Sequence, residues 1–377
     1  MPQLIKKKIK IHKGTIYFKF WLGVILIITS SSNIYLGQQI DSVSKQTKIS
    51  FLPVMGYTPE TSVALGGVLP IIINPKPDSA NFNRPSIIQP VLVLTFKKQF
   101  IFLTDAEVYL KNNINFKVNI EAMKFPNKYS GIGNNTSTFT EHLFDSKHFL
   151  FKPSLLKAFK GVYFAGIILN YNTHQISSPD TSLLTIEKPL GYLGGSGFGL
   201  GPKFKIDTRD DVFYPIKGAY IELISFKFFS PTKDNMNYVN IYLRMSKYFN
   251  YKEKNVFAIS FTTGNNFGNV PFYNFEQIGG ANNIRGLFNT RFTDKFAYFS
   301  QYEYRRHLYK RFKATAFVAF GQVSNKFLDY NINDTKIGYG VGIRFQLTKT
   351  EKLNLRFDYA FASNQSRGFY ISVAEAF

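Results

Sequence analysis

The sequence of 377 residues contains no cysteine, which excludes a disulfide framework, a thiolate metal site, a cysteine nucleophile and a lipidated cysteine. It also lacks long apolar runs. After Ile28, no stretch approaches the roughly 18 apolar residues that a membrane-spanning helix needs. Acidic residues are scarce, with 24 Asp and Glu against 46 Lys and Arg. The mature chain is therefore expected to have no helical membrane anchor and no thiol chemistry.

The excess of basic residues gives a formal net charge of +22. Such a balance is typical of a protein that binds nucleic acid or an anionic membrane surface, or of a channel whose lumen favours anions. The sequence contains no basic helix, zinc module or RNA-binding signature that would organise a nucleic-acid site. We therefore expect no nucleic-acid partner.

The N-terminus has the pattern of a secretion signal. Six lysines and no acidic residue in the first 19 residues precede the apolar run FWLGVILII (Phe20 to Ile28). This run is about half the length that a membrane-spanning helix needs, so it predicts a cleaved signal peptide rather than an anchor. The predicted division is a signal peptide at 1–37, with cleavage near Leu36–Gln39, a short periplasmic segment at 38–48 and one barrel domain at 49–377.

Apolar and polar residues alternate with period two along the mature chain. In Gly338–Leu347, Tyr, Val, Ile, Phe and Leu on one face alternate with Gly, Arg and Gln on the other, and Lys352–Ala362 repeats the pattern. Alternation over nine to eleven residues is typical of a strand that crosses a bilayer at a tilt. With 40 Phe and 23 Tyr, the apolar faces are rich in aromatic residues, as a lipid-facing surface and its interfacial belts require.

A large soluble β-sandwich is the alternative, because its strands alternate as well. Sandwich strands usually have about five or six residues, and their aromatic faces are buried between two sheets. Here Arg, Asp and Asn occupy mid-strand positions on the polar face. The pattern favours an all-β, antiparallel transmembrane β-barrel of about sixteen strands, with loops near 125–147, 175–190 and 266–293. An even strand number places both ends of the barrel domain on the periplasmic side.

Three stretches in order resemble the BamA/TamA family of outer-membrane proteins, the bacterial surface antigen family. They are IDTRDDVFYPIKGAYIEL (206–223), IGGANNIRGLF (278–288) with YEYRR (302–306), and GYGVGIRFQL with LNLRFDYAF and the terminal GFYISVAEAF. The resemblance covers nearly the whole mature chain. It implies a barrel in the outer membrane of a bacterial cell. Only about ten residues separate the expected cleavage point from the first strand, so the periplasmic POTRA modules of that family are expected to be missing.

The same resemblance implies a site inside the barrel. In the family, the loop with the Arg-Gly pair, here Arg285 and Gly286, folds into the lumen, where its Arg contacts an acidic residue of the wall. Period two independently places Glu303 and Asp358 on inward faces. Arg pairs with a carboxylate in a bidentate manner, and Gly permits backbone conformations closed to other residues. The alternative is that Arg285 is an ordinary solvated loop residue.

The last residue, Phe377, matches the aromatic end of the final strand that the barrel-assembly machinery recognises in such proteins, as the resemblance implies. Phe369, Ile371 and Val373 share its face, which predicts a lipid-facing last strand. Glu375 falls on the same face and departs from the apolar pattern. Because many residues of this chain are aromatic, the ending by itself is also compatible with coincidence.

Other patterns are weaker. The glycines at 195, 197, 199 and 201 lack the following helix of a nucleotide-binding loop, and we interpret them as a smooth strand face that a folded-in loop can approach. His142, Asp145 and His148, expected within one loop, have no third firm metal ligand. No nucleophile elbow or zinc-protease motif occurs. Nothing in the sequence selects a lumenal Ser–His pair such as a membrane phospholipase uses. We therefore expect no cofactor, no metal and no enzymatic activity.

The leading functional hypothesis is assembly or translocation of proteins or other envelope components by a barrel whose first and last strands pair weakly. An unpaired strand edge can template an incoming strand. The alternative is a passive, anion-favouring pore. The expected partners are outer-membrane lipid, the barrel-assembly machinery during biogenesis and a separate POTRA-bearing or periplasmic protein.

Overall fold

The computed structural model describes residues 47–58, 62–75, 84–136, 142–231, 235–252, 254–347, 352–363 and 366–377. The expected signal peptide and nearly all of the expected periplasmic segment lie outside the described residues. Among the described residues, no helix is both long and apolar enough to cross a bilayer.

Long antiparallel strands make up most of the described chain. In order they are β1 (Thr47–Ile49), β2 (Leu52–Thr58), β3 (Ser62–Val68), β4 (Ile71–Ile73), β5 (Ser86–Thr95), β6 (Phe100–Leu110), β7 (Ile114–Tyr129), β8 (His142–Phe159), β9 (Tyr163–Ser177), β10 (Gly194–Asp207), β11 (Gly218–Phe229), β12 (Tyr238–Tyr251), β13 (Asn255–Gly268), β14 (Glu276–Gln277), β15 (Thr293–Asp294), β16 (Phe296–Tyr309), β17 (Phe312–Ser324), β18 (Lys336–Gln346), β19 (Asn354–Ala362) and β20 (Ser366–Val373). The helical elements are α1 (Leu183–Glu187), η1 (Lys111–Asn113), η2 (Phe272–Asn274) and η3 (Ile332–Asp334).

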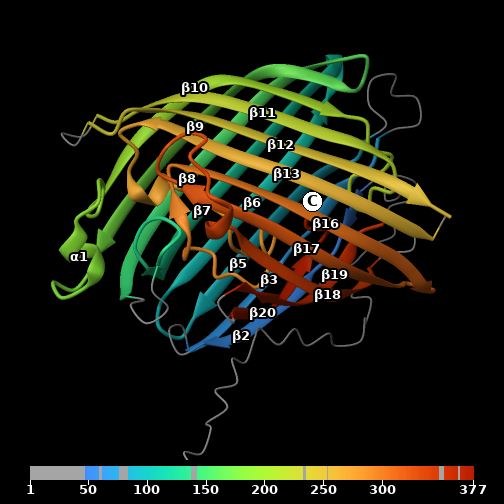
Figure 1. Ribbon diagram of the computed structural model, residues 1–377. Coiled ribbons are helices and arrows are strands. Elements are labelled where there is room, and N and C mark those ends of the chain that lie inside the picture. Colours follow the sequence, from blue (N-terminus) through green and yellow to red (C-terminus); the bar gives the residue numbers. More distant parts are fainter. Residues whose placement is uncertain are drawn as a thin grey trace, which may run out of the picture.

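Eighteen of these strands belong to one sheet, and β14 pairs only with β15. β1 and β2 are two segments of one crossing strand, because they pair with β4 and β3, and β4 and β3 both pair with β5. Counted by crossings, the described residues form a sixteen-stranded barrel wall in which sequential strands are neighbours. The fold class and strand number predicted from the sequence are confirmed, and Figure 1 shows the strands running obliquely around the wall.

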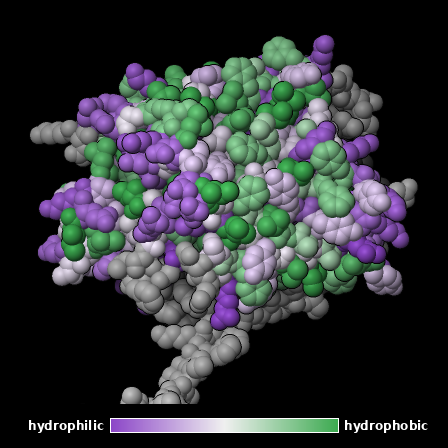
Figure 2. Space-filling model, in the orientation of Figure 1, coloured by the Kyte–Doolittle hydropathy of each residue, from purple (hydrophilic) through white to green (hydrophobic). Residues whose placement is uncertain are grey.

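The outer face of the wall is apolar along the middle of the strands. On β8, for example, Phe149, Phe151 and Leu155 point outward and are 37%, 37% and 48% exposed. The inward face is polar: on β16 it carries Gln301, Glu303 and Arg305, all buried inside the barrel. Figure 2 shows apolar side chains gathered over the middle of one face, with polar side chains mostly toward the two ends. The alternation therefore separates a surface suited to acyl chains from a polar interior.

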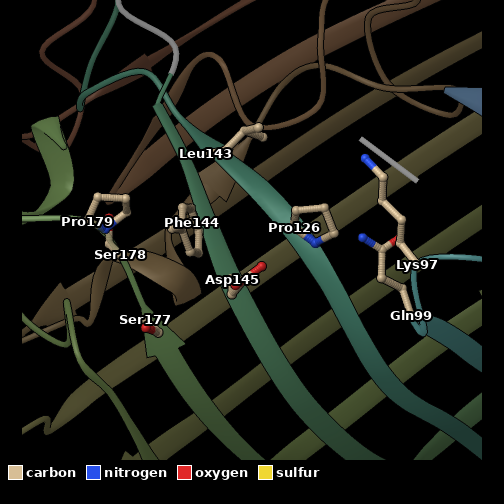
Figure 3. Close-up of a pocket in the computed structure, with 9 residues that line it drawn as sticks. All are labelled: Lys97, Gln99, Pro126, Leu143, Phe144, Asp145, Ser177, Ser178 and Pro179. Atoms are coloured by element: carbon tan, nitrogen blue, oxygen red, sulfur yellow. The ribbon is translucent and has the colours of Figure 1, made fainter. Parts of the chain in front are cut away.

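Beyond this apolar band, at the end of the barrel away from the C-terminus, the wall has a polar rim. There β7, β8 and β9 continue past their neighbours, and Pro126, Asp145 and Ser177 line an outer groove together with Lys97 and Gln99 of the β5–β6 turn (Figure 3). The expected loop at 125–147 is thus wrong in extent, because β7 runs to Tyr129 and β8 begins at His142. Pairing between β7 and β8 continues where their outward residues become polar. The hydrophobic pattern therefore predicted strands that are shorter than the observed ones.

Opposite this rim, the turn after β10 is fixed by charged groups. The buried carboxylate of Asp207 accepts hydrogen bonds from Arg209 Nε and Nη2, both at 2.9 Å, and pairs with Arg84. Asp211 Oδ1 accepts from the backbone N–H groups of Phe213 and Tyr214 at 2.8 and 2.9 Å. The IDTRDD stretch therefore forms a rigid turn at the end of the barrel that carries the C-terminus.

Candidate functional site in the barrel lumen

The loop between β13 and β16 (residues 269–295, the lumenal loop) packs against the inner wall. Its β14 and β15 form a small hairpin, and Gly279 bridges to Ile284. The apolar loop side chains form one buried cluster with inward residues of β16, β17 and β19; the members are Ile278, Ile284, Leu287, Phe292, Ala297, Phe299, Ala319, Val323 and Ala362. The lumenal loop thus has its own apolar contact with the wall, beyond any charged contact.

Arg285 connects the lumenal loop to three strands. Its Nη1 donates to Asp358 Oδ2 on β19 at 2.7 Å, and its Nη2 donates to Glu303 Oε1 on β16. The guanidinium carbon lies 3.5 Å from the ring centroid of Phe317 on β17. Arg285 is only 1% exposed. A planar guanidinium suits this place, because it can bind two carboxylates in its plane and stack an aromatic ring on its face.

The two carboxylates are shared with further arginines. Glu303 Oε2 accepts from Arg305 Nε at 2.7 Å, and Asp358 Oδ1 accepts from Arg344 Nη1. Arg344 Nε in turn donates to Glu375 Oε2 at 2.8 Å. The complete set, called the arginine cluster below, comprises Arg285, Arg305, Arg344, Arg356, Glu303, Asp358 and Glu375, all nearly inaccessible to solvent. Four buried cations thus share three buried carboxylates, so losing any carboxylate would leave charge uncompensated.

Arg356 and Gln301 hold the backbone of the lumenal loop at a second place. Arg356 Nη2 donates to the carbonyl oxygen of Ala281 at 3.0 Å and to Asn282 Oδ1 at 2.8 Å. Gln301 Nε2 donates to the carbonyl oxygen of Asn282 at 2.8 Å. The loop is therefore fastened both through Arg285 and through its own main chain.

Gly286 is needed for both backbone conformation and space. Its φ is +98°, and a Cβ on it would lie 2.8 Å from the carbonyl carbon of Phe361. Its N–H donates to the hydroxyl of Tyr370 on β20 at 2.9 Å. On the wall, a Cβ on Gly338 of β18 would lie 2.4 Å from the carbonyl oxygen of Arg285. Glycine on both sides lets the two backbones approach.

Replacing Gly286 with alanine is expected to destabilise the folded barrel by about 1–3 kcal/mol, because the new Cβ meets both a disfavoured φ and the Phe361 carbonyl. Urea unfolding in lipid vesicles, followed by circular dichroism, measures this. Gly161→Ala is the matched control, since Gly161 also has a positive φ but nothing within 4 Å of its Cβ position. Equal losses in the two variants would contradict the role of close packing at Gly286.

The chain end differs from the expectation of a lipid-facing final strand. β20 ends at Val373, and Ala374 has a φ of +69°, which interrupts the alternation and turns the last three residues into the lumen. Phe377 is 5% exposed, with its ring 6.4 Å from that of Tyr248 on β12, and an oxygen of its terminal carboxyl group accepts from Arg305 Nη2 at 3.2 Å. Phe377 and Glu375 therefore face inward, whereas Phe369 on β20 points outward and is 50% exposed.

The structure also shows where the residues of the weaker sequence patterns lie. His142, Asp145 and His148 lie on β8 rather than in a loop, with Asp145 on the opposite face from His148. His148 stacks on His174 at 4.9 Å between ring centroids. In the part of the chain that the structure describes, no group of three or more His, Asp or Glu side chains could hold a metal ion. A Cβ on Gly195 would lie 2.8 Å from Tyr273 Oη of the lumenal loop, which is the close approach expected for this glycine.

The structure brings Arg285, Gly286, Glu303 and Asp358 together. Sequence reasoning did not assign Arg305, Arg344, Arg356, Tyr370 or Glu375 to the site. Arg305, Arg344 and Arg356 lie on inward faces of their strands. The period-two alternation, combined with the expected position of Arg285 in the lumen, could therefore have indicated them. No sequence signal indicated Glu375, because its position depends on the backbone turn at Ala374.

A sixteen-stranded barrel with an apolar outer band, a polar interior and a loop fastened across that interior defines an outer-membrane β-barrel of bacteria. The model of the Omp85 superfamily domain matches residues 105–377, and the chain belongs to the Omp85 superfamily. Its barrel is of the BamA/TamA type, which confirms the resemblance seen in the sequence.

Three solved structures are similar in fold. BamA from Haemophilus ducreyi lacking POTRA domains 1–3 has a TM-score of 0.54 and 15% identity, covering 87% of this chain and 68% of that one. CdiB from Acinetobacter baumannii has a TM-score of 0.53 and 11% identity, with 87% and 65% covered. CdiB from Escherichia coli has a TM-score of 0.55 and 10% identity, with 94% and 67% covered. The chain thus spans about two thirds of each of these structures. No curated protein matches the sequence.

Proposed function

We propose that this barrel assembles or translocates proteins or other envelope components at the outer membrane, without enzymatic chemistry. The observation that carries the proposal is the lumenal loop, which is fastened by Arg285 to Glu303 and Asp358. A passive pore needs a continuous water path, and a loop held by buried charges and apolar packing opposes one. The Omp85 superfamily membership supports the same class of role.

The region where the first and last strands meet also supports the proposal. The first crossing is broken into β1 and β2, of three and seven residues, whereas β8 has 18 residues. No ladder between β2 and β20 occurs among the residues that the structure describes. A strand edge with unpaired backbone groups can template an incoming strand. We propose that substrates engage the barrel at this seam.

The proposed partners follow from the same role. They are outer-membrane lipid around the apolar band, the barrel-assembly machinery during biogenesis, and a separate POTRA-bearing or periplasmic protein that delivers substrate. The structure of Haemophilus ducreyi BamA is described as lacking POTRA domains 1–3. Co-purification from outer membranes, followed by identification of bound proteins, tests whether such a partner accompanies this chain.

Single-channel conductance in planar bilayers tests the closed lumen. We expect the native protein to stay mostly closed and Arg285→Ala to open at least about tenfold more often, because the loop loses contact with two carboxylates and an aromatic ring. Arg306→Ala is the matched control, since Arg306 lies on β16 with an exposed side chain. Large, steady, anion-selective openings of the native protein would contradict the proposal and support the passive pore.

A positive test measures assembly itself. Vesicles that contain the protein are expected to accelerate the folding and insertion of a urea-unfolded outer-membrane barrel, compared with protein-free vesicles of the same lipid. An incoming strand that pairs with the seam gains main-chain hydrogen bonds before it enters the hydrocarbon layer. Equal rates in the two kinds of vesicle would count against assembly by this chain alone.

A further inference from the structure

A polar cavity lies on the inner wall formed by β7 to β12, on other strands than those that carry the arginine cluster. Inward side chains of β7, β8, β10, β11 and β12 surround a volume of about 300 Å³, with β9 contributing Ile168. The lining side chains are Lys117, Asn119, Lys152, Ser154, Ile168, Lys203, Glu222, Ile224, Tyr242 and Arg244. None of them belongs to the lumenal loop or to the arginine cluster. The cavity is therefore a separate feature of the barrel.

Positive charge dominates this cavity. Lys203 Nζ lies 2.8 Å from Glu222 Oε1, and Lys117 Nζ lies 3.6 Å from Asp105 Oδ1 just outside the lining. The lining itself thus holds four cationic side chains and one carboxylate, Glu222. Glu107 and Glu121 also act on these lysines from outside the lining, but they pair with Lys205 and His148. Such an excess on a wall of low dielectric constant focuses the electric field and attracts anions from the enclosed water.

Lys152 and Arg244 carry the excess. Among the described residues, neither makes an ion pair or hydrogen bond; Lys152 Nζ lies 5.6 Å from the ring centroid of Phe226, and the Arg244 guanidinium lies 5.9 Å from that of Tyr220. Glu276 of the lumenal loop acts on Lys152 electrostatically, but its hydrogen bonds come from the side chains of Asn240 and Asn266. Aromatic rings orient these two cations but leave their N–H donors for another acceptor.

We propose that this cavity binds a small, multiply charged oxyanion such as a phosphate or diphosphate group. Guanidinium and ammonium donors form charge-assisted hydrogen bonds with phosphate oxygens, and Asn119, Ser154 and Tyr242 add neutral donors. The volume is at the lower end of ligand sites, which suits a small anion. Because the lining side chains face inward, the ligand enters from the lumenal water and not from the lipid leaflet. This site extends beyond the proposed function and does not depend on it.

Isothermal titration calorimetry with inorganic pyrophosphate tests the site, using the full-length mature protein in lipid nanodiscs at constant ionic strength. We expect saturable binding by the native protein and at least about tenfold weaker binding by the Lys152→Gln/Arg244→Gln double variant. The matched control, Lys124→Gln/Lys147→Gln, removes the same charge from exposed outer positions of β7 and β8 and is expected to bind like the native protein. Circular dichroism verifies that each variant is folded.

A second variant gives a result that misfolding cannot imitate. Glu222→Gln removes the carboxylate that neutralises Lys203, so pyrophosphate is expected to bind several-fold more tightly. Undiminished binding by the Lys152/Arg244 variant, equal loss in the control, or unchanged or weaker binding by Glu222→Gln would each overturn the proposal. Heat that follows only the total ionic strength, with no saturation, would overturn it as well, because it indicates diffuse screening and no defined site.

Discussion

Replacing Asp358 with alanine is expected to destabilise the folded barrel by about 3–5 kcal/mol. The Asp358 carboxylate accepts from Arg285 at 2.7 Å, pairs with Arg344 and lies 3.4 Å from Arg356 Nε, all without solvent access. Without it, the four arginines of the cluster share only Glu303 and Glu375. Removing one partner from a buried ionic network costs far more than removing an exposed one, because the remaining charges cannot regain water.

Urea unfolding in lipid vesicles, followed by far-ultraviolet circular dichroism, measures this loss. Asp105→Ala is the control, because Asp105 also pairs with a wall cation, Lys117, but is 56% exposed in its side chain. For Asp105 we expect a change of about 0–1 kcal/mol. If Asp358→Ala unfolds at the same urea concentration as the native protein, the arginine cluster does not stabilise the barrel.

Replacing Phe377 with alanine is expected to cost about 3 kcal/mol, in the range for a buried aromatic side chain. The ring packs in a buried cluster with Tyr248, Ala258 and Ala376, and it lies 5.3 Å from the Arg305 guanidinium. Phe369→Ala is the matched control, since Phe369 on β20 faces outward. There the same truncation is expected to cost less, about 1–2 kcal/mol, because only contact with acyl chains is lost and no packing inside the barrel.

The two variants also separate two roles of the chain end. Recognition of Phe377, Phe369, Ile371 and Val373 by the barrel-assembly machinery predicts that either variant lowers the amount of folded protein in cells. The lumenal position of Phe377 predicts in addition that purified, already folded protein is weakened more by Phe377→Ala than by Phe369→Ala. Equal stability of the two purified variants would contradict the packing of the Phe377 ring inside the barrel.

Much of the wall could be predicted because each strand residue faces either lipid or lumen. Tyr339, Val341 and Ile343 are exposed on the outer face of β18, as the alternation indicates, while Arg344 and Asp358 are buried inside. The same rule turned Glu303 inward, where Arg285 meets it. These placements need only the period of the strand and the two solvents that the wall separates.

Placements that depend on a single backbone torsion could not be predicted. Ala374 takes a positive φ without being glycine, and that one residue moves Glu375 and Phe377 from the outer face to the lumen. The contacts of Arg356 with the carbonyl of Ala281 and the side chain of Asn282 likewise depend on how the lumenal loop folds. The period-two alternation predicts the orientation of residues within strands, but not of residues that leave the sheet.

Arg344 is one of the side chains that link the chain end to the site of the lumenal loop. Its Nε binds Glu375 at the chain end, and its Nη1 binds Asp358, which also holds Arg285. Withdrawing the residues after β20 from the interior would therefore remove an acceptor from Arg344 and change the charge balance around Asp358, which holds the lumenal loop. Movement of the chain end and release of the lumenal loop are therefore expected to be coupled, through Arg344 and also through the Gly286–Tyr370 and Arg305–Phe377 contacts.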